Sequence, residues 1–162
     1  MKYDGHSELL KAAPKRLRDA QELLEEPTLE PHGSDADCRH LCGACYLAGY
    51  AVECVLKAYV IRLLAHRTSQ HLVRWSQAIV HFDGVHDLHG AASHNLARLL
   101  VVSELAGELD ADPQMKRVWS MCVLWRPDWR YLRSNGMGPA EARQFVDACA
   151  AAHDWVRQRL HF

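Results

Sequence analysis

Apolar residues recur at intervals of three and four along most of this chain, a spacing that places side chains on one face of an α-helix. The pattern predicts five helices, over residues 7–26, 35–65, 93–107, 112–126 and 140–160. No segment shows the sustained alternation typical of a strand. We therefore expect an all-α, up-and-down bundle of four to five helices that forms a single domain over residues 1–162.

Local signals mark the ends of these helices. Ser7 and Ser93 are candidate N-caps, and Asp112-Pro113 is a typical helix start because proline is tolerated in the first turn. The connection over residues 66–92 is poorly patterned and rich in histidine, and a short helix over 71–79 is compatible with it.

The second predicted helix begins with Cys-x3-Cys-x2-Cys, the spacing with which radical S-adenosylmethionine enzymes hold an iron–sulfur cluster. On a straight helix these three thiols would climb roughly 10 Å at 1.5 Å per residue, too far for one compact cluster. The same 4-3 rhythm continues beyond them as one apolar stripe: Cys38, Cys42, Cys45, Gly49, Val52, Leu56, Tyr59 and Leu63. We interpret the cysteines as packing residues and expect no cofactor; zinc held by Cys42, Cys45 and nearby histidines is the alternative.

Composition and charge narrow the functional classes. Charged residues make up 24% of the 162 positions and the formal net charge is -1, so the chain has neither the signature of disorder nor the basicity of many nucleic-acid binders. Its start lacks an apolar run followed by small residues, which predicts no signal peptide, and no window approaches the length of a membrane span. We expect a cytoplasmic protein with reduced thiols and no membrane contact.

Short sequence motifs give little indication of a catalytic function. His86-Asp87 and His153-Asp154 each match the metal-binding His-Asp pair of all-α phosphohydrolases, but two-residue matches arise easily by chance. We interpret the six histidines of the weakly patterned middle as surface or capping residues and expect no metal site; they are His66, His71, His81, His86, His89 and His94. The chain contains no Gly-x-Ser-x-Gly, no phosphate-binding glycine-rich loop and no His-Glu-x-x-His.

Several segments, taken in order, resemble the HEPN domain family. The resemblance spans most of the chain and includes ACYLAGYAVECVLKAYV, SHNLARLL, WRPDWRYL and a closing AEARQFVDACAAAHDWVRQRL. The residues that chiefly carry it are Ala51, Glu53, Leu56, Lys57, Ala58, His94, Asn95, Leu96, Arg130 and Tyr131.

The resemblance implies a bundle of four or five helices that is often a homodimer, associated in bacteria with RNA cleavage, toxin–antitoxin pairs and nucleotidyltransferase partners. In the ribonuclease branches an Arg-x4–6-His motif from each protomer lines the dimer cleft. Here Arg74 and His81 fit that spacing, but they lie upstream of the family's position. The C-terminal arginines Arg130, Arg133 and Arg143 have no histidine at the required distance, so we expect the catalytic motif to be absent or degenerate.

Three hypotheses about function follow. We favour an interaction or regulatory module, associated with RNA or a nucleotidyltransferase in a bacterial defence or toxin–antitoxin system. A metal-independent endoribonuclease that uses Arg74 and His81 is one alternative. The other is a bundle that binds a small nucleotide between the second and fourth helices.

The candidate residues for such a pocket are Glu53, Lys57, Arg130 and Tyr131. Glu53 and Lys57 have the i, i+4 spacing either of a helix-surface pair or of two groups that flank a cleft with Arg130 and Tyr131. For Arg130 we expect a carboxylate partner, such as Glu53, rather than a phosphate.

Overall fold

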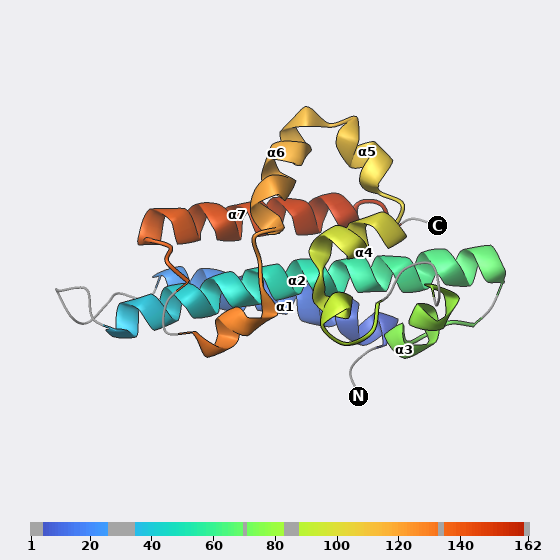
Figure 1. The fold of residues 1–162 in the computed structure, drawn as a ribbon, viewed down its shortest axis with the longest axis horizontal. Helices are drawn as coiled ribbons and strands as arrows, with labels where there is room; N and C mark the ends of the chain where they lie inside the picture. Colours follow the sequence, from blue (N-terminus) through green and yellow to red (C-terminus); the bar gives the residue numbers. More distant parts are fainter. Residues whose placement is uncertain (1–4, 26–34, 70, 83–87, 133–134, 161–162) are drawn as a thin grey trace.

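The computed structural model describes residues 5–25, 35–69, 71–82, 88–132 and 135–160, and within these ranges the protein is an all-α bundle without strands, as predicted (Figure 1). The long helices are α1 (His6–Glu25), α2 (Asp35–Thr68) and α7 (Pro139–Arg157). The shorter α-helices are α3 (Trp75–Ala78), α4 (Leu96–Val102), α5 (Ala106–Asp110) and α6 (Pro113–Cys122). Three 3-10 turns complete the described elements: η1 (Ile79–Phe82), η2 (Gly90–His94) and η3 (Pro127–Tyr131).

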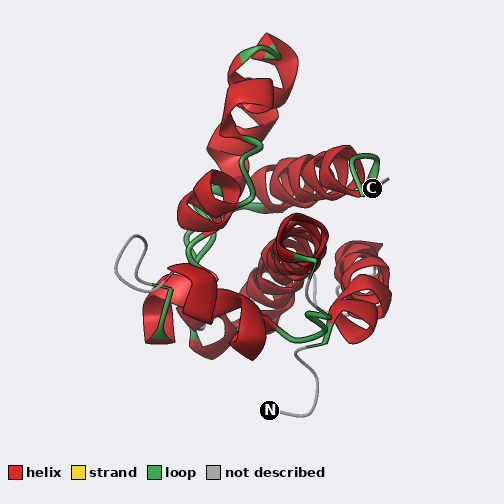
Figure 2. Ribbon diagram, turned by 90° about the vertical axis from the view of Figure 1, so that its right-hand side faces the viewer, coloured by secondary structure: helices red, strands yellow, loops and turns green. Residues whose placement is uncertain are grey.

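Helix α2 is the centre of the bundle. Residues 51–60 are all buried, an unbroken run of nearly three turns. Apart from Glu53 and Lys57 this run is apolar on every side, so it must be covered on every side, and α1 and α7 supply most of that cover. Helix α1 runs antiparallel to α2, whereas α7 runs in the same direction as α2. Figure 2 shows the three long helices nearly end-on.

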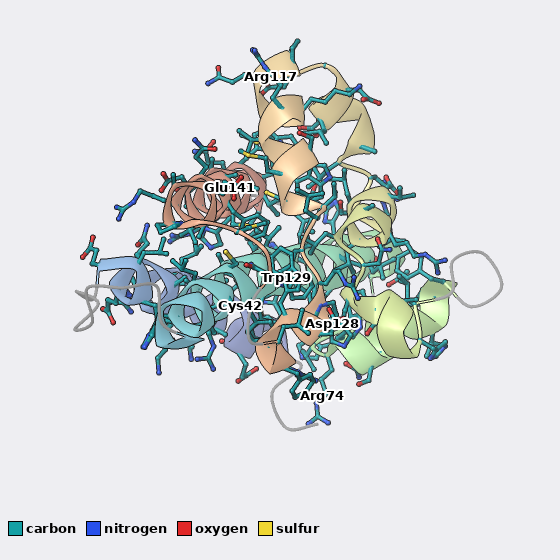
Figure 3. The ribbon with its side chains drawn as sticks, turned by 60° about the vertical axis from the view of Figure 1, so that its left-hand side comes forward. Cys42, Arg74, Arg117, Asp128, Trp129 and Glu141 are labelled. Carbon is teal, nitrogen blue, oxygen red and sulfur yellow. The ribbon has the colours of Figure 1, made fainter. Side chains whose placement is uncertain are left out.

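The cysteine stripe of α2 packs into this core. Cys42 and Cys45 are fully buried; the Cys42 thiol donates a hydrogen bond to the carbonyl of Trp129, 3.1 Å away, and the Cys45 thiol lies 3.7 Å from the sulfur of Met137. Figure 3 shows Cys42 and Trp129 together where η3 meets α2. Burial raises the pKa of the Cys45 thiol to about 11, so at neutral pH this group is a protonated, apolar core residue. The predicted packing role of these two residues is confirmed, while the Cys38 side chain lies outside the described part.

Helices α5 and α6 form an arm that projects beyond α7 (Figures 1 and 2). Helix α6 contacts α7, and its start is the predicted one: Asp112 accepts a hydrogen bond of 2.9 Å from the backbone N–H of Met115, and Pro113 occupies the first turn. The arm is therefore anchored to the bundle through the side of α6 that faces α7.

Two predicted caps are wrong. The first helix already begins at His6, which places Ser7 inside it, and Ser93 lies in η2, where its hydroxyl donates to the carbonyl of Gly90. The cap of α4 is Asn95, whose side chain accepts a hydrogen bond of 3.0 Å from the N–H of Arg98. An amide oxygen in the extended Asn95 position reaches the free N–H groups of the first turn, which Ser93 cannot do from within a helical turn.

The third predicted helix is two helices. Glu104 adopts a left-handed backbone with φ of 62°, which ends α4 and separates it from α5. The Glu104 carboxylate pairs with both terminal nitrogens of Arg67 near the end of α2. This long-range pair, together with the left-handed residue, explains why the apolar periodicity of 93–107 did not give one continuous helix.

The poorly patterned connection contains short helical elements. Helix α3 lies within the predicted 71–79 segment, and the start of α1 holds it: His6 donates from its backbone to the carbonyl of Val73 at 2.8 Å. Trp75 and Ala78 of α3 are buried, and α3 packs on α2. The segment therefore covers the second half of α2. Among the described helices, none combines the length and apolar character required to cross a bilayer.

The contact between Gly49 and Trp125 predicts an asymmetry between two glycines of α2. The Trp125 indole donates to the carbonyl of Tyr46 at 3.1 Å and lies across Gly49, where an added Cβ would stand 2.0 Å from the ring. At Gly43 an added Cβ would meet Leu23 at an ordinary 3.7 Å. Replacing glycine by alanine gains about 1 kcal/mol of helix propensity at either site. At Gly49 alone, the overpacking against Trp125 costs about 1–3 kcal/mol.

We expect Gly43→Ala to raise the free energy of unfolding and Gly49→Ala to lower it, as measured by urea denaturation followed by circular dichroism. Equal stabilisation in both variants would contradict the contact between Gly49 and Trp125.

Candidate functional site

The most unusual feature of the core is a buried ion pair on α2. The Glu53 side chain is 2% exposed and that of Lys57 is 9% exposed, and Lys57 Nζ lies 2.5 Å from Glu53 Oε1. The i, i+4 spacing on one helix face brings the two groups together. Because α3 and α4 cover this part of α2, the pair lies inside the bundle rather than on a helix surface.

A histidine from a distant part of the chain completes the cluster. His94, at the end of η2, places its Nδ1 2.9 Å from Oε1 and 3.0 Å from Oε2 of Glu53. A carboxylate only accepts hydrogen bonds, so Nδ1 carries the proton in this arrangement. The Nε2 atom of His94 is then left as the nitrogen directed away from Glu53, on a side chain that is 41% exposed.

An aromatic ring covers the ammonium group. Lys57 Nζ lies 5.2 Å from the centroid of the Trp75 ring, within the range of a cation–π interaction. Trp75 is buried, and its indole N–H has no acceptor among the described residues. Trp75 reaches this position because α3 is held beside the start of α1.

The cluster borders a cavity of about 260 Å³. Four segments of the chain meet there: α1, α2, the α3–η1 turn and the segment that leads into α4. The walls are mostly apolar, and the polar groups that line the cavity include Glu53, Lys57 and His94 with the hydroxyls of Ser76 and Ser93. Apart from the charged cluster, the lining includes Leu9, Tyr50, Trp75, Ser76, Ile79 and Leu88. An apolar pocket with a few convergent polar groups has the general character of a small-molecule site.

A second cavity, of about 380 Å³, lies on the other side of His94. Its lining includes Trp125, Arg126 and Asp128. The Arg126 guanidinium pairs with the Asp128 carboxylate through contacts of 2.6 and 3.1 Å, so its charge is already compensated. His94 therefore lines both cavities.

The structure separates the four residues predicted for a pocket. Glu53 and Lys57 border the 260 Å³ cavity, whereas Arg130 and Tyr131 belong to η3 and are not among its lining residues. The Arg130 guanidinium stacks 4.5 Å from the centroid of the Tyr131 ring, and a hydrogen bond with Tyr46 raises the pKa of Arg130.

The expected pairing of Arg130 with Glu53 is therefore not formed; Lys57 and His94 take that place. The physical reason is position along α2. Trp129 in η3 contacts Cys42, which precedes Glu53 by about three helical turns, or roughly 16 Å.

The residues of the ribonuclease alternative lie on the outer side of the α3–η1 segment. Arg74 directly precedes α3 and His81 is in η1, and both side chains are exposed. Neither is among the residues that line the 260 Å³ cavity, and Figure 3 shows Arg74 projecting outward. Within a single chain, Arg74 and His81 therefore lie outside the buried cluster.

The two His-Asp pairs have different outcomes. His86-Asp87 lies outside the described residues. His153 is buried in α7, with its Nδ1 2.9 Å from Asp154 Oδ1, and burial lowers the pKa of this imidazole. Within the described ranges, no group of three or more histidine, cysteine, aspartate or glutamate side chains has the arrangement of a metal site.

Sequence reasoning missed how His94 and Trp75 are used. The tripeptide His94-Asn95-Leu96 was part of the resemblance, but nothing local assigns its histidine to Glu53. The available signal was indirect: a glutamate within a ten-residue apolar run is expected to be buried, and a buried carboxylate needs donors besides one lysine.

The buried pair predicts a large and strongly coupled effect on stability. Glu53→Leu leaves the Lys57 ammonium buried without its carboxylate and should cost about 3–5 kcal/mol of unfolding free energy. The double variant Glu53→Leu/Lys57→Met should recover much of that loss, because no unpaired charge remains. Chemical denaturation of the two single variants and the double variant gives the coupling directly.

The matched control is the exposed pair of Lys116 and Asp110, whose side chains are 62% and 66% exposed. Asp110→Leu should cost less than about 1 kcal/mol, as exposed pairs usually do. If Glu53→Leu were as mild as Asp110→Leu, the buried pair would not have the placement described above.

Comparison with known proteins adds no relative. No family model, no curated protein and no solved structure matches this chain.

Proposed function

We propose that this chain is a HEPN-like bundle that acts as an interaction or regulatory module, associated with RNA or with a nucleotidyltransferase partner in a bacterial defence or toxin–antitoxin system. One observation carries the proposal. Two of the three segments that chiefly carry the HEPN resemblance, around Glu53 on α2 and around His94 before α4, meet where His94 Nδ1 lies 2.9 and 3.0 Å from the two Glu53 carboxylate oxygens. The all-helical architecture is consistent with it.

The position of the cluster favours binding over catalysis. Glu53 and Lys57 compensate each other's charge deep in the bundle, and the arginine and histidine of the ribonuclease hypothesis lie outside the cavity. A module that recognises a partner needs a shaped site with fixed polar groups, which this cavity offers. We also propose a cytoplasmic location, which is supported by the free thiols of the described cysteines Cys42, Cys45, Cys54, Cys122 and Cys149.

A second function, the metal-independent endoribonuclease, is favoured by one specific observation. Arg74 and His81 lie on the same short α3–η1 segment, and both are exposed. In a homodimer, two copies of this segment could face one cleft, with arginine against the phosphate and histidine moving the 2′-hydroxyl proton.

One assay separates the two functions. The purified protein, with chelator present, is incubated with labelled hairpin and single-stranded RNA, and binding is read by fluorescence anisotropy while cleavage is read on denaturing gels. We expect binding at up to about 100 µM protein, the weak end of non-specific affinity, because the net charge of -1 gives little electrostatic attraction. We expect no cleavage.

Arg74→Ala and His81→Ala are the test variants, and Arg117→Ala on the arm and the exposed His71→Ala are matched controls. Cleavage by the wild type that is lost in both test variants and kept in both controls would replace the module with the ribonuclease. Absence of any RNA binding would contradict the RNA branch of the proposal.

We further propose that the chain forms a homodimer through exposed apolar side chains that follow α6 and that lie at the end of η3. Val123 and Leu124 follow α6, and Tyr131 and Leu132 end η3 and follow it; all four are exposed, Leu124 by 57% and Tyr131 by 74%. Large apolar groups left on a surface are typical of contact sites.

Leu124→Asp should shift the protein from dimer to monomer in sedimentation velocity, because a buried unpaired carboxylate is costly at an interface. The control is Val80→Asp in η1, at a residue that is 62% exposed, which should leave the dimer intact. A wild type that sediments as a monomer at high micromolar concentration would remove the dimer from the proposal.

A further inference from the structure

The floor of the 260 Å³ cavity contains hydrogen-bonding capacity that the described protein leaves unused. The Lys57 ammonium has three N–H donors, of which one is accounted for by Glu53 Oε1. No second acceptor for Nζ occurs among the described residues, and the Trp75 ring covers part of the group. An ammonium that is nine-tenths buried therefore borders the cavity with donors to spare.

An acceptor lies beside this donor. Oε1 of Glu53 accepts a hydrogen bond from Lys57, and the single Nδ1–H of His94 is shared between Oε1 and Oε2. A carboxylate oxygen can accept two, so Oε2 retains one vacant position with respect to the described residues. The cavity floor thus presents a donor and an acceptor side by side on α2.

The charge balance selects the kind of ligand. Glu53 and Lys57 neutralise each other, and a phosphate or carboxylate ligand would place a second negative charge beside Glu53. A neutral ligand with one acceptor next to one donor satisfies both groups without introducing a charge. The –C(=O)–NH– edge of a lactam ring has this arrangement.

The walls select the shape. Leu9, Ile79 and Leu88 are aliphatic, and Tyr50 and Trp75 add aromatic surface, so the lining suits an apolar, flat body. At about 260 Å³ the cavity is slightly smaller than the sites of drug-sized ligands, which occupy about 300–1,000 Å³. A single ring system fits that size.

We propose that the cavity binds the lactam edge of a neutral nucleobase, with the ring carbonyl accepting from Lys57 and the ring N–H donating to Glu53. The inference rests on the proposed RNA association and names the group that the module would recognise. The base can belong to a free nucleoside or to an unpaired nucleotide of an RNA strand, since both present the same edge.

The decisive probe is a pair of compounds that differ only at this edge. 1-Methyluracil keeps its N3–H donor, whereas 1,3-dimethyluracil lacks it and leaves Glu53 Oε2 unpaired. Isothermal titration of the full chain should show binding of the first and at least about tenfold weaker binding of the second. Equal affinity for both, or no binding of 1-methyluracil up to its solubility limit, would overturn the proposal.

Benzoate and inorganic phosphate test the charge argument. Benzoate is flat and of similar size but anionic, and phosphate is anionic without a ring. Both should bind at least about tenfold more weakly than 1-methyluracil. If benzoate bound as well as or better than 1-methyluracil, the cavity would be an anion site and the proposal would fail.

The site itself is tested at its rim, so that the buried cluster stays intact. Ser76 borders the cavity and is exposed on α3, and Ser76→Phe should obstruct the mouth and weaken 1-methyluracil binding by at least about tenfold. The matched control is Ser120→Phe, at an exposed serine of α6 outside the cavity lining, which should bind like the wild type. Thermal melts establish that both variants are folded, and unchanged binding by a folded Ser76→Phe would exclude this cavity as the site.

A uridine tetranucleotide separates the two sources of the base and also separates this inference from the function on which it rests. Tighter binding of the tetranucleotide than of 1-methyluracil, weakened by Ser76→Phe, supports recognition of a base within RNA. Binding of the small compound alone supports a free nucleoside as the ligand. RNA binding that is unaffected by Ser76→Phe would keep the RNA association and refute the cavity as its recognition site.

Discussion

The burial of the Glu53 carboxylate constrains the rest of the structure. A carboxylate inside an apolar helix bundle is strongly unfavourable unless donors surround it, and a single lysine one turn away supplies only part of the requirement. The remaining donor, His94, comes from 41 residues further along the chain. The connection between α2 and α4 must therefore return to the middle of α2, and Trp75 is brought over Lys57 on the way.

The same constraint explains why a cavity exists at this place. Helices α1 and α7 pack along α2 with small and apolar side chains, whereas the cover over Glu53 comes from the short elements α3, η1 and η2. The charged cluster fixes these turns at one end and the backbone link between His6 and Val73 fixes them at the other. The space between is the cavity, which Glu53 and Lys57 line from α2 and which Ser76, Ser93 and His94 line from the covering turns.

The sequence predicted well what depends on local periodicity. The long helix expected over 35–65 is Asp35–Thr68, and the stripe through Cys42 and Cys45 is buried as predicted. The helix start at Asp112-Pro113 was also predictable, because a cap and its first turn are adjacent in sequence. It did not predict the break at Glu104, where a left-handed residue accompanies a long-range ion pair.

Only part of the candidate site could be predicted from the sequence. The spacing of Glu53 and Lys57 is a property of one helix, so their contact followed from sequence, but the partnership with His94 depends on the path of residues 66–92, which have weak periodicity. Arg130 looked equally suitable as a partner by charge, and only the position of η3 beside Cys42 excludes it. The charge of a side chain therefore does not predict which of several basic residues will lie beside Glu53, because that depends on the path of the segments that connect them to α2.

Stability alone does not explain the buried ion pair of Glu53 and Lys57, because apolar residues of similar volume often stabilise a fold as well or better. Charges at the floor of a cavity, with donor and acceptor positions left over, are better explained by a group that enters and uses them.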